Sequence, residues 1–296
     1  MMSLEHIRSN VRERIQRLRE ATAGTRGPAP DVCGDCQGTG WVVHRKDGIG
    51  RASRCECWIR ENTGKLKEST GIPVRYARCT FDGFTVYPNE DLERAFRRAR
   101  EFADRFPVRQ ASLLLAGPSG IGKTHLAAAI LNTCAEKGIG GVYCETAALL
   151  TQLRSTYDKD SGTQDTSILR RLSNADLLVL DDLGAEQLTQ WGQNMLHAVL
   201  NARYNQELPT ICTTRLPPSP HARDSLLFEI GGRMLSMLDQ MCDVIEFDGA
   251  DYRHAGEHPD ADSLQTLWEE RRRRANAPAP RAHFSPGDGQ RHAEPA

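Results

Sequence analysis

Residues 117–124 read Gly-Pro-Ser-Gly-Ile-Gly-Lys-Thr, a complete phosphate-binding loop of the pattern G-x-x-x-x-G-K-[ST]. The loop follows the apolar run 111–116 and precedes the helix-forming run 125–134, so the local order is strand, loop, helix. Glycines let the backbone turn its N–H groups toward phosphate, and the helix start adds partial positive charge. We therefore expect a triphosphate to bind here, with contacts from Gly117, Pro118, Ser119, Gly120, Ile121, Gly122, Lys123, Thr124 and His125.

Two acids further along the chain complete this predicted site. Lys123 is expected to reach the β- and γ-phosphates, and Thr124 to hold Mg²⁺ through its hydroxyl. The apolar run 177–180 ends in Asp181 and Asp182, and a carboxylate at the end of such a strand approaches Mg²⁺ on the neighbouring loop. Asp181 is thus predicted on the Mg²⁺ side, and Asp182 is predicted to orient or deprotonate the attacking water. A plain helix cap is the alternative for this pair.

The pattern around the loop predicts an α/β fold. Apolar strand-like runs alternate with helical stretches of crossover length, which favours a parallel five-stranded sheet covered on both faces. The expected strands are 111–116, 140–145, 176–181, 209–213 and 243–247. A length of 296 residues allows one such domain with a small module and tails. The expected organisation starts with a helix and linker at 1–30 and a cysteine-rich module at 31–72. A lead-in follows at 73–106, and it ends in a helix from Asp91 to Phe106. The nucleotide domain occupies 107–254, and a largely disordered tail occupies 255–296.

The two ends of the chain carry arginine-rich segments. Apolar residues recur at steps of three and four from Leu4 to Leu18, which predicts an amphipathic helix that docks a partner or packs on its own neighbour. After Asp251 the periodicity is lost, and the run 271–274 consists of four arginines, read as phosphate contacts or as the solvated end of a helix.

Overall charge and hydropathy limit the location and the partners. The formal net charge is −1, so any nucleic-acid binding must come from local basic patches. We find no apolar run long enough to cross a membrane and no signal peptide, which predicts a cytosolic protein with no membrane partner.

Four of the nine cysteines form two short-spaced pairs, Cys33 with Cys36 and Cys55 with Cys57. Two such pairs in a reducing compartment predict a tetrahedral Zn²⁺ site, although the one-residue gap of the second pair leaves His44 or Cys79 as alternative fourth ligands. The segment has few apolar residues, so bound metal would supply its folding energy and the site would be structural. Four free thiols in a loop are the alternative. The remaining Cys134, Cys144, Cys212 and Cys242 are expected to be buried small hydrophobes.

Several motifs give the chain a family resemblance. With the loop at 117–124, Leu-Asp-Asp-Leu-Gly-Ala-Glu at 180–186, Trp191, Arg203-Tyr204 and Leu-Pro-Thr-Ile at 208–211, it resembles the DnaC/IstB branch of AAA+ ATPases from about Cys33 to Arg253. Residues 71–84 also look like the lead-in of DnaC-type helicase loaders. The resemblance implies an AAA+ core at 107–254 that binds ATP and assembles into an oligomer.

The resemblance also implies roles for single residues. Arg233 matches the arginine finger that completes a neighbour's site, with an ordinary surface arginine as the alternative, and Arg253 is a candidate second sensor. The family commonly has Asn where this chain has Arg215, which leaves Thr214 as the candidate for water positioning and implies slow hydrolysis.

Relatives in this branch bind single-stranded DNA between the two nucleotide motifs. The corresponding segment here is 149–172, with Gln152, Arg154, Tyr157, Lys159, Arg170 and Arg171. Cations beside an aromatic ring suit backbone contact and base stacking, and an amphipathic surface is the alternative.

Three functions are compatible with these patterns. The favoured one is an ATP-dependent loader of a DnaB-like replicative helicase onto single-stranded DNA, because the cysteine module resembles that of loaders. The second is an IstB-like ATPase that helps a transposase act on target DNA. The third is an adaptor that binds ATP with little hydrolysis. The sequence leaves the partner, the number of subunits and a host or mobile-element origin open.

Overall fold

The computed structural model describes residues 32–46, 49–108, 110–157, 167–185, 188–218, 225–256 and 259–275. The chain divides into two compact units, Met1–Thr63 and Gly64–Ala296. The division falls inside helix α2 (Glu56–Ser69), whereas the sequence suggested that the cysteine module ends at residue 72. The predicted helix and linker at 1–30, Lys159 and the segment 276–296 lie outside the described residues.

The described part of the first unit is built on a two-stranded antiparallel hairpin. Strand β1 (Trp41–Lys46) pairs with β2 (Ile49–Arg54), and Trp41 lies opposite Arg54. The Arg54 guanidinium carbon is 3.9 Å from the ring centroids of both Trp41 and Trp58, which places a cation between two aromatic faces. The hairpin closes where the Cys55 N–H donates to the Gly40 carbonyl at 2.9 Å. It therefore brings the two cysteine pairs, which flank it in sequence, to the same end.

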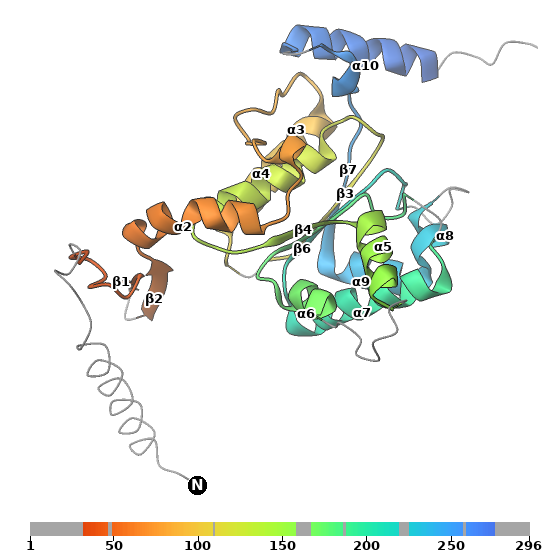
Figure 1. The fold of residues 1–296 in the computed structure, drawn as a ribbon. Helices are drawn as coiled ribbons and strands as arrows, with labels where there is room; N and C mark the ends of the chain where they lie inside the picture. Colours follow the sequence, from red (N-terminus) through yellow and green to blue (C-terminus); the bar gives the residue numbers. More distant parts are fainter. Residues whose placement is uncertain are drawn as a thin grey trace, which may run out of the picture. The chain divides into compact units, whose positions relative to one another are not determined.

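The second unit contains a parallel five-stranded sheet, which confirms the predicted α/β fold (Figure 1). The strand order is β4-β5-β6-β3-β7, and every neighbouring pair is parallel. The strands are β3 (Ser112–Ala116), β4 (Val142–Glu145), β5 (Leu178–Asp181), β6 (Thr210–Thr214) and β7 (Cys242–Glu246). Each bound lies within two residues of the expected one. β4 starts at Val142 rather than at 140, after two glycines that have no side chain to pack.

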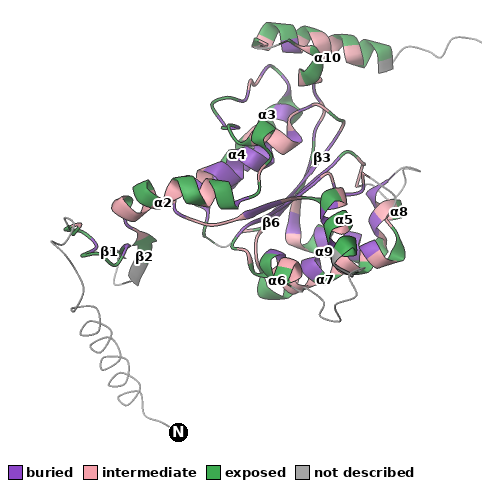
Figure 2. Cartoon of the chain, in the orientation of Figure 1, coloured by how far each residue is buried: buried purple, intermediate pink, exposed green. Residues whose placement is uncertain are grey.

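Helices cover both faces of this sheet. Leu113 and Leu115 of β3 enter one core with α3, α4 and α10, while Leu114 enters a second core with α5 to α9. Strands β3, β5 and β6 and most of α4 are buried (Figure 2). The helices are α3 (Glu90–Arg105), α4 (Lys123–Glu136), α5 (Thr146–Tyr157), α6 (Ser167–Asn174), α7 (Gln190–Gln206), α8 (Leu226–Ile230), α9 (Gly232–Met241) and α10 (Ala261–Ala275), with 3-10 turns η1 (Val74–Tyr76) and η2 (Tyr252–His254). None of the helices among the described residues has the length and apolar content needed to cross a bilayer.

The lead-in segment packs into the core of the nucleotide unit. Asn89 caps the start of α3, and its side-chain oxygen accepts from the N–H groups of Asp91 at 3.1 Å and Leu92 at 3.3 Å. Phe81 and Phe84 precede this cap and are buried in the same core as α4. The lead-in therefore belongs structurally to the domain that carries the phosphate loop.

The expectation of an irregular chain after Asp251 is wrong for residues 261–275, which form α10. Leu264 is fully buried, and Leu267 and Trp268 pack against the core. These apolar residues make only a narrow stripe at helical spacing, in a segment otherwise rich in charge, so periodicity alone gives a weak signal. Tertiary contacts through the stripe account for the helix.

Candidate functional site

The phosphate loop lies between β3 and α4 in a conformation that requires its glycines. Gly120 and Gly122 have φ angles of 83° and 96°, which favour glycine strongly. A Cβ on Gly122 would also lie 2.4 Å from the Phe84 ring. The lead-in thus packs directly against the loop, which explains why glycine is needed at this point.

Lys123 starts α4 and points back at the loop. Its Nζ donates to the carbonyls of Gly117 and Pro118, both at 2.7 Å, and the residue is only 8% exposed. Burial lowers the pKa of Lys123 to about 8, and the negative charges of Asp182 and Asp181 oppose that shift. The ammonium group has three donors, so one is left for a ligand while the loop holds the other two.

Proton uptake on ATP binding should increase with pH. A group with a pKa of about 8 is roughly three-quarters deprotonated at pH 8.5 and about one-tenth at pH 7.0. Bound phosphate favours the charged form, so we expect uptake of roughly 0.7 proton per Mg-ATP at pH 8.5 and about 0.1 at pH 7.0. The affinity for ATP should accordingly decline above about pH 8. Calorimetry in buffers of different ionisation enthalpy measures the proton uptake, and equal uptake at the two pH values would contradict the prediction.

Asp181 lies at the carboxyl end of β5 among three hydroxyl groups. Its carboxylate accepts from Thr124 Oγ1 at 3.0 Å, from Thr213 Oγ1 at 2.6 Å and from the Tyr143 hydroxyl at 2.6 Å. Burial, followed by the charge of Asp181, raises the pKa of Tyr143, so its hydroxyl stays protonated and donates. The loop threonine and the strand acid therefore meet, and their oxygens are of the kind that suits Mg²⁺.

Sequence reasoning missed Tyr143 and Thr213. They come from β4 and β6, the two neighbours of β5 in the sheet. The available signal was their position, because polar side chains near the carboxyl ends of adjacent parallel strands gather at one edge.

Thr213 lies beside Asp181, whereas Thr214, the residue predicted to position water, does not. The Thr214 hydroxyl donates to the Leu183 carbonyl at 2.7 Å and accepts from the Leu216 N–H at 3.1 Å, and the residue is fully buried. Successive side chains on a strand point to opposite faces, so only one of the two threonines can face the carboxylate. Water positioning by Thr214 thus stays a prediction, with its hydroxyl held between Leu183 and Leu216.

Asp182 follows the strand in a left-handed conformation with φ of 55°. Its N–H donates to Thr213 Oγ1 at 2.9 Å, which fixes the turn that leaves the sheet. Its side chain lines a small hollow together with Arg154 and Trp191. It is therefore held next to Asp181, and its backbone N–H shares the Thr213 hydroxyl with that carboxylate.

Comparison with known proteins identifies the fold and the family. The model of the IstB-like ATP binding proteins matches residues 95–258, which include the phosphate loop, Asp181 and Arg253. The chain belongs to the IstB-like family. The replicative helicase loader DnaC of Escherichia coli K12 is 28% identical over 170 residues, which is 56% of this chain and 67% of that protein.

Solved structures agree with this assignment. The crystal structure of the DnaC helicase loader superposes with a TM-score of 0.52 at 31% identity, covering 60% of this chain and 100% of that one. The crystal structure of DnaI superposes with a TM-score of 0.52 at 22% identity, covering 60% of this chain and 96% of that one, and shows a shared fold. The sheet and helices are thus the AAA+ nucleotide-binding core that the resemblance implied.

The arginines suggested by the IstB-like resemblance lie in different settings. Arg233 is exposed at the first turn of α9, where a partner molecule could reach it. Arg253 is exposed in η2. The positive charges of Arg253 and of Arg271 in α10 both lower the pKa of Lys123. Arg215 donates to the Ala185 carbonyl and is thereby tied to the loop after β5. Sequence reasoning treated Arg271 only as part of a charged run.

The other residues predicted to contact the nucleotide differ in their surroundings. His125 Nε2 lies 2.8 Å from the Thr80 carbonyl, and its ring is 5.3 Å from that of Phe84. The side chain of His125 therefore faces the lead-in. Ile121 is fully buried in the core, whereas Ser119 is exposed.

The predicted DNA face is partly engaged with the protein itself. The Arg154 guanidinium carbon lies 5.7 Å from the centroid of the Trp191 ring, and Arg171 donates to the Ser69 carbonyl at 2.6 Å. Gln152 and Arg170 are exposed, and no placement is described for the Tyr157 side chain. A cation beside an aromatic ring fits a nucleic-acid contact at Arg154.

The four module cysteines converge on one point. The sulfurs of Cys33, Cys36, Cys55 and Cys57 all lie within 4.8 Å of one another, and two sulfur pairs are 3.7 and 3.4 Å apart. Tetrahedral Zn–S bonds of about 2.3 Å place sulfurs about 3.8 Å apart, so the cluster fits such an ion. A hydrogen bond with the Gly40 backbone lowers the pKa of Cys36 to about 7, whereas hydrogen bonds with Cys36 and Cys55 raise the pKa of Cys57.

The alternative fourth ligands are engaged elsewhere. His44 Nε2 lies 3.1 Å from Ser53 Oγ, and Cys79 is buried in the second unit. Cys134, Cys212 and Cys242 are buried as expected, and Cys144 is half-buried.

Proposed function

We propose that this protein is an ATP-dependent loader of a replicative hexameric helicase of the DnaB type onto single-stranded DNA. The observation that carries the proposal is the similarity to the DnaC helicase loader, whose solved structure is covered over its whole length at 31% identity. The meeting of Thr124 and Asp181 beside the loop supports a working nucleotide site within that similarity.

ATP would be bound and hydrolysed by residues already held in place. Lys123 binds the β- and γ-phosphates, while Thr124 and Asp181 hold Mg²⁺, which when bound neutralises phosphate charge. Asp182 orients the attacking water beside that pair. Arg233 of a neighbouring copy stabilises the charge of the transition state, so hydrolysis depends on assembly and is slow for the isolated chain.

ATP acts as a switch in this proposal. Its binding orders the oligomer and the helicase complex, and contact of single-stranded DNA with the 149–172 face triggers hydrolysis, which releases the helicase. The cysteine module, with Zn²⁺ on its four thiolates, and the segment 1–30 grip the helicase in the cytosol. The metal has a structural role there.

Light scattering on a sizing column, with the helicase of the same host or phage, tests the proposal. We expect a stable co-complex in ATP that loosens in ADP. Absence of a complex in both nucleotides would contradict the loader function.

Replacing Arg233 with alanine separates hydrolysis from binding. We expect ATP affinity to change less than about twofold, while DNA-stimulated phosphate release falls at least about 100-fold, because an arginine supplied in trans contributes roughly 10³–10⁵ in rate in related chemistry. The matched control is Arg97→Ala, on the exposed side of α3. Phosphate release by Arg233→Ala at the wild-type rate would contradict the proposal that Arg233 acts as an arginine finger.

The family match also supports a second candidate, an IstB-like ATPase that helps a transposase act on target DNA. The matched residues 95–258 contain the nucleotide core and exclude the cysteine module, so the core alone fits either function. A complex with a neighbouring transposase, and none with the helicase, would favour this candidate. Phosphate release stimulated by single-stranded DNA would dispose of a third candidate, an adaptor with little hydrolysis.

A further inference from the structure

The segment after β7 forms a strap along the phosphate loop. We define the strap as residues 248–253. The Tyr252 N–H donates to the Gly120 carbonyl at 3.0 Å. A Cβ on Gly120 would lie 1.8 Å from the Asp251 carboxylate, so that carboxylate packs directly against the glycine. The strap therefore braces the backbone of the loop whose N–H groups would meet phosphate.

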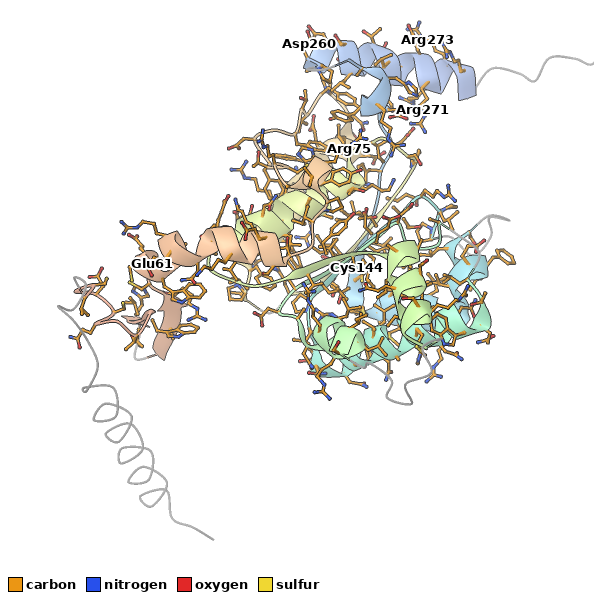
Figure 3. All side chains as sticks on the ribbon, viewed as in Figure 1. Glu61, Arg75, Cys144, Asp260, Arg271 and Arg273 are labelled. Atoms are coloured by element: carbon orange, nitrogen blue, oxygen red, sulfur yellow. The ribbon has the colours of Figure 1, made fainter. Side chains whose placement is uncertain are left out.

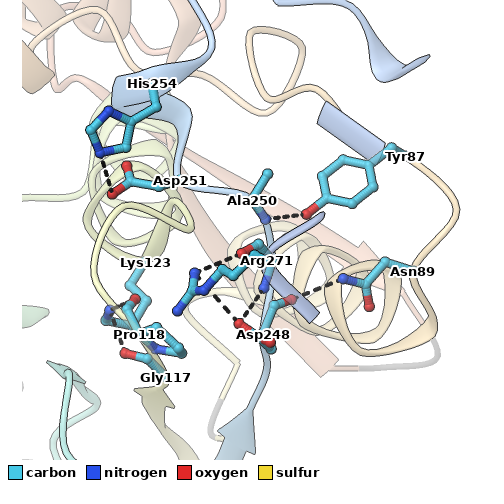
Figure 4. Close-up of polar contacts among 11 residues, drawn as sticks. Tyr87, Asn89, Gly117, Pro118, Lys123, Asp248, Ala250, Asp251, His254 and Arg271 are labelled. Carbon is cyan, nitrogen blue, oxygen red and sulfur yellow. Dashed lines mark hydrogen bonds and ion pairs between the residues drawn. The ribbon is translucent and has the colours of Figure 1, made fainter. Parts of the chain in front are cut away.

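Two sides of the molecule hold this strap. From the lead-in, the Tyr87 hydroxyl accepts from the Ala250 N–H at 2.6 Å, and the Asn89 amide donates to the Asp248 carbonyl at 2.9 Å. From α10, Arg271 Nη1 donates to the Gly249 carbonyl at 2.9 Å and lies 3.7 Å from the Asp248 carboxylate (Figure 4). The strap is thus clamped at its first three residues, just before it reaches the loop.

Helix α10 is well placed to act as the outer half of this clamp. Leu264 is fully buried, and the Trp268 ring centroid lies 6.0 Å from that of Tyr87. The helix therefore packs on the same tyrosine that holds Ala250. α10 lies beyond the residues 95–258 that the family model matches.

We propose that Arg271 is a positioning residue of the nucleotide site, which holds the strap against the phosphate loop from α10 and thereby raises the affinity for ATP. The inference rests on the proposed binding of ATP at this loop. A loop whose backbone is already fixed loses less freedom when the nucleotide binds, so loosening the clamp weakens binding. Arg271 acts through Asp248 and Gly249.

The test compares ATP affinities, measured by competition against a fluorescent nucleotide, in the full chain. We expect Arg271→Ala and Arg271→Gln to weaken ATP binding by about tenfold, the scale of one charge-assisted hydrogen bond, and Arg271→Lys to recover most of the loss. The matched control is Arg273→Ala, because Arg273 lies on the opposite side of α10 and pairs with Glu269 (Figure 3). It should bind ATP like the wild type. Rescue by lysine and not by glutamine separates positioning by charge from simple packing.

A second variant keeps the test decisive if Arg271→Ala fails to fold. Tyr87→Phe keeps the ring that packs on Trp268 and removes only the hydroxyl that accepts from Ala250. We expect it to fold, to melt at a somewhat lower temperature because the buried Ala250 N–H loses its acceptor, and to weaken ATP binding several-fold. Equal ATP affinity in wild type, Tyr87→Phe and the folded Arg271 variants would overturn the inference. Failure of the wild type itself to bind ATP would instead overturn the proposed function.

Discussion

Replacing Lys123 with alanine is expected to weaken ATP binding by at least about 100-fold and to abolish phosphate release. The side chain is 8% exposed and donates to two carbonyls of the loop. Its removal takes away the buried positive charge proposed to bind the triphosphate, and charge-assisted contacts are worth about 1.5–3 kcal/mol each. The loop also loses its internal brace. Both losses act on the same ligand, so the effect should exceed that of any other single change in the nucleotide unit.

The matched control for this prediction is Lys65→Ala, which removes an exposed lysine of α2 in the same unit. Calorimetry should give the wild-type affinity for this variant. The melting temperature of unliganded Lys123→Ala should stay close to that of the wild type, because burial of its charge already works against the folded state, as its lowered pKa shows. Wild-type ATP binding by a folded Lys123→Ala would contradict the assignment of the loop.

The sheet and the position of Asp181 at its carboxyl edge were predictable because short-range patterns specify them. Strands β3 and β5 contain compact apolar runs, and Asp181 directly follows the run of β5. In a parallel sheet the carboxyl ends of the strands meet at one edge, so the approach of Asp181 to Thr124 follows from topology alone. Neither inference needed knowledge of side-chain packing.

The partners of Asp181 could not be fixed in the same way. Whether Thr213 or Thr214 faces the carboxylate depends on the register of β6, and a shift of one residue reverses the outcome. Tyr143 reaches Asp181 only because β4 lies next to β5. Strand order is a tertiary property, and nothing in the local sequence of β4 reports it.

Helix α10 shows the same limit at the C-terminal end of the described chain. Its apolar stripe stabilises the helix by packing on the core around Tyr87, and the stripe consists of Leu264, Leu267 and Trp268. The role inferred for Arg271 depends on backbone carbonyls that the sequence does not display. Long-range contacts to main-chain atoms are therefore the part of the site that required the structure.

Replacing Cys36 with serine is expected to weaken zinc binding at least about 100-fold and to unfold the cysteine module. Cys36 is 4% exposed, and its sulfur lies 3.4 Å from that of Cys57. A four-thiolate site contributes on the order of 10–16 kcal/mol to folding, and the hairpin has little apolar material to replace it. Metal analysis of the purified variant should show loss of zinc. Fluorescence should report exposure of Trp41 and Trp58 as the Arg54 stack is lost.

A control at a cysteine outside the module tests whether loss of zinc is specific to the four proposed ligands. Cys79→Ser removes a thiol of the second unit, so it should keep the full zinc content although it alters a buried position. ATP affinity of Cys36→Ser should stay within about twofold of the wild type, because the nucleotide unit has its own two cores. Zinc must displace protons from the thiols, so binding should weaken as the pH falls below 7. Full zinc content in Cys36→Ser, or loss of zinc in Cys79→Ser, would contradict the assigned ligand set.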